Sequence, residues 1–129
     1  MVSVTKIVEF EAAHQLLGHK GKCQFVHGHS YKLEVEVVNK LKNASTLLNA
    51  SNLEEAMVID FGDLKNAVLT IVNGSLDHKF INDQIKIPTA ERMVILIANN
   101  LPCFLSRDIN IVRVRLWETS TSYAEWRKY

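Results

Sequence analysis

The chain has 129 residues, of which 47% are hydrophobic and 22% charged, and its formal net charge is +1 at pH 7. These values suit one globular domain over residues 1–129, and they argue against nucleic-acid binding over a broad basic surface. No apolar run approaches the roughly 20 residues that span a bilayer, and the N-terminal segment carries too many charges for a signal peptide. We expect a cytoplasmic protein with no nucleic-acid or membrane partner, whose two cysteines stay reduced.

Two segments alternate in polarity as half-buried strands do. In the first, one face carries Val8, Phe10, Ala12 and His14. In the second, one face carries His27, His29, Tyr31, Leu33, Val35 and Val37, and the other carries Lys32, Glu34 and Glu36. Residues 40–54 are expected to be a long hairpin loop or an insertion, and residues 57–59 a short strand.

Two helices are predicted after these strands. Asp60 is a plausible N-cap for a helix over residues 61–73 that Gly74 closes, and a loop over residues 75–83 follows. Thr89 caps a second helix, which Pro102 ends. A last strand has one face formed by Val112, Val114, Leu116 and Glu118. This order predicts an α+β fold, an antiparallel β-sheet with two helices packed on one face.

Histidines at the ends of the first two strands are candidate metal ligands. His27 and His29 alternate on one face, about 7 Å apart, so that their imidazoles can converge on one ion. His14 ends the first strand on its apolar face, so one sheet can present all three rings. Three neutral imidazoles with an open fourth position are typical of a catalytic zinc site. The alternative is that each histidine is an ordinary loop or core residue.

Cys23 lies four residues before His27, and three roles are open to it. It can be a fourth ligand that closes a structural zinc site, a thiolate that acts on a ligand of the metal, or a small buried apolar residue. The sequence predicts the last of these for Cys103, which lies among Pro102, Phe104 and Leu105.

Three acidic or basic side chains complete the candidate site. Glu118 extends an apolar strand face, where an unpaired carboxylate is costly. A ligand with adjacent N–H donors, such as a 2-aminopyrimidinone edge, would satisfy both oxygens; a salt bridge to a nearby arginine or exposure at the strand end is the alternative. Asp77 precedes His78 in a loop, where a carboxylate can orient an imidazole for proton transfer, although such pairs are common in loops.

Six stretches together resemble the 6-pyruvoyltetrahydropterin synthase / 6-carboxytetrahydropterin synthase family. They occur in the family's order along nearly the whole chain: FEAAHQL (10–16), CQFVHGHSY (23–31), MVIDFGDLK (57–65), LDHKFIN (76–82), PTAE (88–91) and WET (117–119). The chain departs from the family pattern at Ala56, where a glycine is common, and in the longer, Asn-rich segment 40–54.

The resemblance implies a tunnelling fold whose sheets join into an oligomeric barrel, a homohexamer of two stacked trimers with active sites at subunit interfaces. It implies that His14, His27 and His29 bind zinc and that Cys23 is the proton-abstracting base. It also implies that Asp77 and His78 form a relay, that Glu118 anchors the pterin ring, and that Thr89 lies near that ring.

The implied activity is a lyase reaction on 7,8-dihydroneopterin triphosphate. The spacing from Cys23 to His27 resembles the 6-carboxytetrahydropterin synthase branch, which forms 6-carboxytetrahydropterin, acetaldehyde and triphosphate on the route to queuosine. Three alternatives stay open: a 6-pyruvoyltetrahydropterin synthase that eliminates triphosphate from the same substrate, another tunnelling-fold enzyme acting on pterins or purines, and a non-catalytic binding module stapled by zinc.

Overall fold

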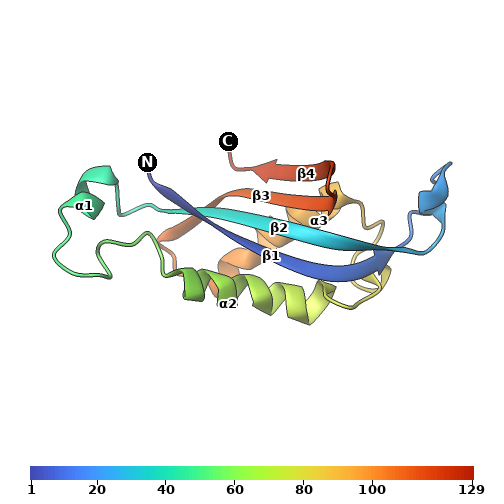
Figure 1. The fold of residues 1–129 in the computed structure, drawn as a ribbon, viewed down its shortest axis with the longest axis horizontal. Helices are drawn as coiled ribbons and strands as arrows, with labels where there is room; N and C mark the ends of the chain where they lie inside the picture. The colour runs from blue at the N-terminus through green and yellow to red at the C-terminus, as the bar shows by residue number, and fades with distance from the viewer.

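The computed structural model describes all 129 residues, and its framework is a four-stranded antiparallel sheet (Figure 1). The strands are β1 (Ser3–His14), β2 (His27–Asn39), β3 (Ile109–Thr119) and β4 (Ser122–Arg127), in the order β1-β2-β3-β4. Each strand pairs with the next along the chain. The predicted antiparallel sheet is therefore confirmed.

Three α-helices lie in the connection between β2 and β3. They are α1 (Ala44–Leu48), α2 (Phe61–Ile71) and α3 (Ala90–Asn100). Figure 1 shows α2 running along the sheet beside β1, and α1 standing away from it at the end remote from the β1–β2 connection. Short 3₁₀ turns occupy Lys22–Gln24, Ile81–Asp83 and Leu101–Phe104. None of the helices is both long and apolar enough to cross a membrane.

One hydrophobic core of 23 buried residues joins α2 and α3 to the same face of the sheet. The face predicted from the alternation of β1 and β2 is the buried one, with Phe10, Tyr31 and Leu33 at most 3% exposed. Leu64 of α2 and Met93 of α3 are fully buried against it. The two helices thus pack on one face, as the sequence predicted, and His14 lies at the end of that buried face.

The other face of the sheet carries paired charges. Arg115 pairs with Glu125 across the β3–β4 register at 2.7 Å, and Arg113 pairs with Glu36 of β2 at 2.8 Å. Burial raises the pKa of Glu125, but Arg115 and Arg127 outweigh it, so that the pKa lies below its ordinary value. These ion pairs join β2, β3 and β4 across the polar face.

Both predicted helix caps are confirmed. The Asp60 side chain accepts a hydrogen bond from Asp63 N–H at 3.1 Å, and the Thr89 hydroxyl accepts one from Arg92 N–H at 3.2 Å. Each cap satisfies a backbone donor of the first helical turn that has no partner within the helix. The cap at Thr89 fixes where α3 begins, next to the candidate site.

The structure corrects two predicted element boundaries in the connection. Residues 57–59 form no strand, because Val58 packs into the core and its carbonyl accepts from the Asn39 side chain at 3.2 Å instead of from a neighbouring strand. Gly74 does not close α2, because a π-helical turn, Val72–Leu76, continues it, with Asp77 N–H bonded to the Val72 carbonyl at 2.7 Å.

The structure also changes the expected form of the C-terminal half. A β-bulge in the β2–β3 pairing places Ile111 opposite Val37, so Ile109 and Ile111 enter the core, not Val112 as predicted. Strand β4 was not predicted from the sequence. Residues 40–54 contain the short helix α1, which begins with a reciprocal cap between Asn43 and Thr46.

Candidate metal centre

The three candidate ligands converge because of the β1–β2 register. His14 pairs with His27, and Ala12 pairs with His29, so the last residue of β1 lies across from the first residues of β2. All three rings project from the buried face. One ligand atom from each histidine lies within 4.8 Å of the others, so the three could hold one metal ion. His14 is fully buried, whereas His27 and His29 are partly exposed.

Backbone carbonyls select which nitrogens face the centre of the group. The His14 Nδ1 atom lies 2.9 Å from the Pro88 carbonyl, and the His27 Nδ1 atom lies 2.8 Å from the Phe25 carbonyl. A carbonyl oxygen can only accept, so each Nδ1 is the protonated nitrogen and each Nε2 has a free lone pair. The His27 Nε2 atom is buried and has no hydrogen-bond partner. A cation between the rings would satisfy it.

The surroundings favour the neutral form of His29 and bring one carboxylate close. Burial lowers the pKa of His29, against the opposing effect of Glu118, and His14 and His27 lower it further. Neutral imidazole is the form that binds a metal. Glu118 Oε1 lies 3.7 Å from His14 Nε2. The Tyr31 hydroxyl lies 3.4 Å from His14 Nδ1, and burial, with a smaller contribution from Glu118, raises the pKa of Tyr31.

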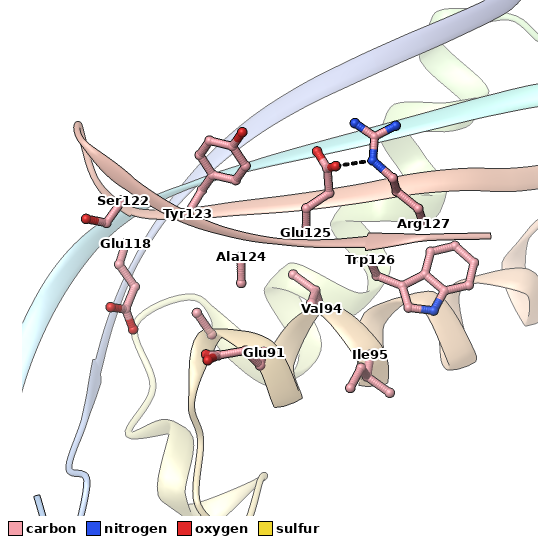
Figure 2. Close-up of a pocket in the computed structure, with 11 residues that line it drawn as sticks. Glu91, Val94, Ile95, Glu118, Ser122, Tyr123, Ala124, Glu125, Trp126 and Arg127 are labelled. Carbon is pink, nitrogen blue, oxygen red and sulfur yellow. Dashed lines mark hydrogen bonds and ion pairs between the residues drawn. The ribbon is translucent and has the colours of Figure 1, made fainter. Parts of the chain in front are cut away.

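Glu118 also lines a cavity between α3 and β4 with a volume of about 590 Å³. Figure 2 shows Ala124 and Trp126 facing α3 across this space, while Glu125 and Arg127 turn toward the other face of β4. The cavity begins beside the cap of α3, and Glu91 in the first turn lines it as well. Through Glu118 the cavity comes close to His14, one of the candidate metal ligands, and Glu118 and Glu91 offer two carboxylates to a bound molecule.

Asp77 and His78 lie beside β1, at the edge of the sheet. The Asp77 carboxylate accepts from Glu11 N–H at 3.1 Å and lies 3.0 Å from His78 Nδ1. Glu11 N–H, and then His78, lower the pKa of Asp77. His78 has a φ of +57°, an unusual conformation for a residue with a side chain, and its side chain is 78% exposed. The structure therefore brings the predicted pair together and leaves its imidazole exposed to solvent.

His78 and His29 line the same open cavity of about 480 Å³. This cavity lies against the end of β1, where Ala13 forms an isolated bridge with Phe80. A group bound there can reach both the metal ligands and the imidazole of the pair.

Cys23 lies in the short turn that precedes β2. Its thiol is free and partly buried, and its carbonyl accepts from Leu16 N–H at 2.8 Å, which fixes the turn against the end of β1. The thiol is not a member of the three-histidine group. Cys103 is exposed, so the expectation that it is a small buried residue is wrong. It ends up in the 3₁₀ turn after α3, on the surface.

Sequence reasoning did not single out Glu91 or the carbonyl of Pro88. Both lie in the PTAE stretch, and the signal available was the Thr89 cap: it predicts a helix start, and the first turn of a helix favours an acidic residue. The contact between Pro88 and His14 joins residues 74 positions apart, so only the tertiary structure reveals it.

The family model described as 6-pyruvoyl tetrahydropterin synthase matches residues 3–128, and the chain belongs to this family. The chain is 36% identical over 150 aligned positions to the 6-carboxy-5,6,7,8-tetrahydropterin synthase of Haemophilus influenzae, an alignment that covers 99% of this chain and 100% of that protein. It is 32% identical to the enzyme of the same name from Rickettsia typhi, covering 97% and 99%.

Solved structures confirm the fold. The 6-pyruvoyl tetrahydropterin synthase of Caenorhabditis elegans superposes with a TM-score of 0.74 at 21% identity, covering 99% of this chain and 96% of that one. The corresponding Plasmodium falciparum protein gives a TM-score of 0.67 at 20% identity, covering 98% of each chain. The predicted tunnelling fold is thus confirmed for the subunit.

Proposed function

We propose that the chain is a zinc-dependent 6-carboxy-5,6,7,8-tetrahydropterin synthase, a lyase that converts 7,8-dihydroneopterin triphosphate and water into 6-carboxytetrahydropterin, acetaldehyde and triphosphate. The names of the relatives from Haemophilus influenzae and Rickettsia typhi support this activity. The observation that carries the proposal is the group of three histidines, in which the carbonyls of Pro88 and Phe25 leave the Nε2 atoms of His14 and His27 free.

The donor set fits zinc. Zinc–imidazole bonds of about 2.0–2.1 Å in a tetrahedron place two ligand nitrogens roughly 3.4 Å apart. The Nε2 atoms of His14 and His29 are 3.2 Å apart, close to that separation. Because no thiol belongs to the group, the fourth position stays open to a substrate oxygen. When bound, the metal would polarise the side-chain oxygens of the substrate as a Lewis acid.

The protein side chains have separate roles around that centre. Glu118 anchors the pterin ring from the cavity between α3 and β4, with Thr89 at the start of α3 beside it. The Cys23 thiolate removes a proton from the substrate side chain. His78, oriented by Asp77 at 3.0 Å, moves protons at its exposed ring as triphosphate leaves. Glu91 is a second carboxylate in the same cavity, so it is the alternative residue that could bind the ring.

We further propose that the active protein is a homohexamer of two stacked trimers. The outer edge of β4 has no partner strand within the chain, and β1 is bridged on its outer side only near its end, by Phe80. Free strand edges favour pairing with another chain. Pairing of these edges between subunits would close the sheets into a barrel.

Product analysis tests the activity. Zinc-loaded protein is incubated with 7,8-dihydroneopterin triphosphate, and acetaldehyde and the pterin product are measured. The proposal predicts acetaldehyde and 6-carboxytetrahydropterin in equal amounts. Release of triphosphate without acetaldehyde would assign the chain to the 6-pyruvoyl activity instead. No turnover, with zinc still bound, would favour a binding module.

A further inference from the structure

The turn that leads into α3 contains a strained residue. Ile87 has a φ of +52°, in the left-handed region that β-branched residues rarely adopt because their side chain crowds the backbone. The Ile87 side chain is 50% exposed, so burial of that side chain does not account for the conformation. Such strain persists where the surrounding structure enforces it, and it clusters at functional sites.

Hydrogen bonds on both sides hold this turn in place. Thr89 N–H donates to the Ile87 carbonyl at 2.9 Å, which closes a three-residue turn centred on Pro88. The Arg92 guanidinium donates to the Lys86 carbonyl at 3.2 Å, and the Arg92 backbone N–H donates to the Thr89 hydroxyl at 3.2 Å. Pro88 itself is buried. These contacts fix the direction of the Pro88 carbonyl.

That carbonyl decides the tautomer of His14. It lies 2.9 Å from His14 Nδ1, whereas the competing Tyr31 hydroxyl is 3.4 Å away. A hydroxyl can donate to a bare Nδ1, which would leave the proton on Nε2, pointing at the Nε2 atom of His29 3.2 Å away. A carbonyl can only accept, so it keeps the proton on Nδ1 and the lone pair of Nε2 available to the metal.

We propose that Ile87 and Pro88 are positioning residues of the metal centre: the left-handed conformation of Ile87 aims the Pro88 carbonyl at His14 and so selects the tautomer that binds the ion. Neither side chain touches the ion. The inference rests on the proposed metal site but not on the identity of the substrate. It also links that site to the first turn of α3, where Ala90 and Glu91 line the cavity.

The first test reads the tautomer directly in the full-length protein after chelation of metal. Long-range ¹⁵N NMR at about pH 8, where an ordinary imidazole is neutral, distinguishes Nδ1–H from Nε2–H. The inference predicts Nδ1–H for His14. Nε2–H in the parent protein would overturn it, whatever the variants do.

The second test compares two substitutions of Ile87. Proline cannot adopt a positive φ, whereas glycine adopts it readily. Ile87→Pro is expected to mix the His14 tautomers and to weaken zinc binding by about 10- to 100-fold in competition with a chromophoric chelator, the usual loss when a ligand's outer partner is removed. Ile87→Gly is expected to keep the parent tautomer and affinity.

Circular dichroism checks that each variant is folded. A folded Ile87→Pro protein with the parent's tautomer and zinc affinity would contradict the inference, as would an equal loss of affinity in Ile87→Gly. If Ile87→Pro does not fold, two results remain to test the inference. It is contradicted if His14 carries Nε2–H in the parent protein, or if Ile87→Gly binds zinc more weakly than the parent. Acetaldehyde formation is a separate readout, so failure of the proposed activity leaves the tautomer result interpretable.

Discussion

Glu118 Oε1 and His14 Nε2 lie 3.7 Å apart, so the carboxylate at the end of β3 is next to the nitrogen that faces the metal position. The same carboxylate lines the cavity between α3 and β4. Glu118 therefore lies between the three-histidine group and the cavity. Binding of the proposed pterin ring and reaction of the substrate's side chain can be tested with separate variants.

The first prediction concerns anchoring of the ring. Glu118→Gln is expected to weaken binding of a pterin without a triphosphate side chain by about 10- to 100-fold, since a hydrogen bond to a charged group contributes roughly 1.5–3 kcal/mol. Isothermal titration calorimetry measures it, with Glu91→Gln as the matched variant in the same cavity. A loss of pterin affinity in Glu91→Gln alone would show that Glu91 of α3, and not Glu118, binds the ring.

The second prediction concerns metal content. Replacing His14, His27 or His29 by alanine is expected to remove the metal, which elemental analysis should find at one ion per chain in the parent. Added metal should stabilise the parent by about 2.7 kcal/mol at a free concentration of 100 times Kd, and the variants hardly at all. His19→Ala is the matched control, because the His19 ring accepts from Gly21 N–H in an exposed loop. Metal loss in that variant would point to a different site.

The third prediction separates catalysis by Cys23 from a structural role. Cys23→Ala is expected to keep the metal and the melting temperature but to abolish acetaldehyde formation. Cys103→Ala, which alters the other, exposed thiol, should keep all three properties. If Cys23→Ala loses the metal and unfolds, the thiol closes a structural site and the chain is a binding module.

The fourth prediction concerns the Asp77–His78 pair. Asp77→Asn removes the carboxylate that orients the imidazole, and His78→Ala removes the imidazole itself. Each is expected to lower kcat by about 10²- to 10⁴-fold, the usual contribution of a general acid–base group. Metal content should not change, because neither residue belongs to the histidine group. A change in KM alone, with kcat preserved, would contradict a role in proton transfer.

The fifth prediction concerns the charged face of the sheet. The pKa of Glu125 is lower in the folded protein than its ordinary value of 4.5 because of Arg115 and Arg127. A depressed folded pKa contributes stability above the unfolded pKa and loses it as the pH falls through the folded value. Urea unfolding between about pH 6 and pH 3 should therefore show a steeper loss of stability in the parent than in Glu125→Gln. Parallel curves would show that Glu125 contributes nothing to the acid sensitivity.

Local signals in the sequence predicted the parts of the fold that depend on local chemistry. Alternation in β1 and β2 gave the buried face that carries the three histidines, and Asp60 and Thr89 marked both helix starts. Strand β4 was missed because it is only six residues long and mixes two aromatic residues with four of weaker strand preference, and its stability comes from pairing with β3. The bulge near Val112 shifts the inward face, which strict alternation cannot anticipate.

The site was predictable as a set of residue types but not as a geometry. The His27–His29 spacing indicated two ligands. His14 joins them only because the β1–β2 register places it opposite His27. The carbonyl partners of the rings, and the approach of Glu118 to His14, depend on the packing of segments distant in sequence. Backbone acceptors have no side-chain signature, so Pro88 could not be identified beforehand.

X-ray absorption spectroscopy at the zinc edge tests the central claim most directly, because it counts the ligands of the bound ion. An open three-histidine centre should give three imidazole nitrogens at about 2.0–2.1 Å and one further light atom, with no sulfur. A sulfur at about 2.3 Å would place Cys23 on the metal, and an open catalytic centre at His14, His27 and His29 would then be wrong.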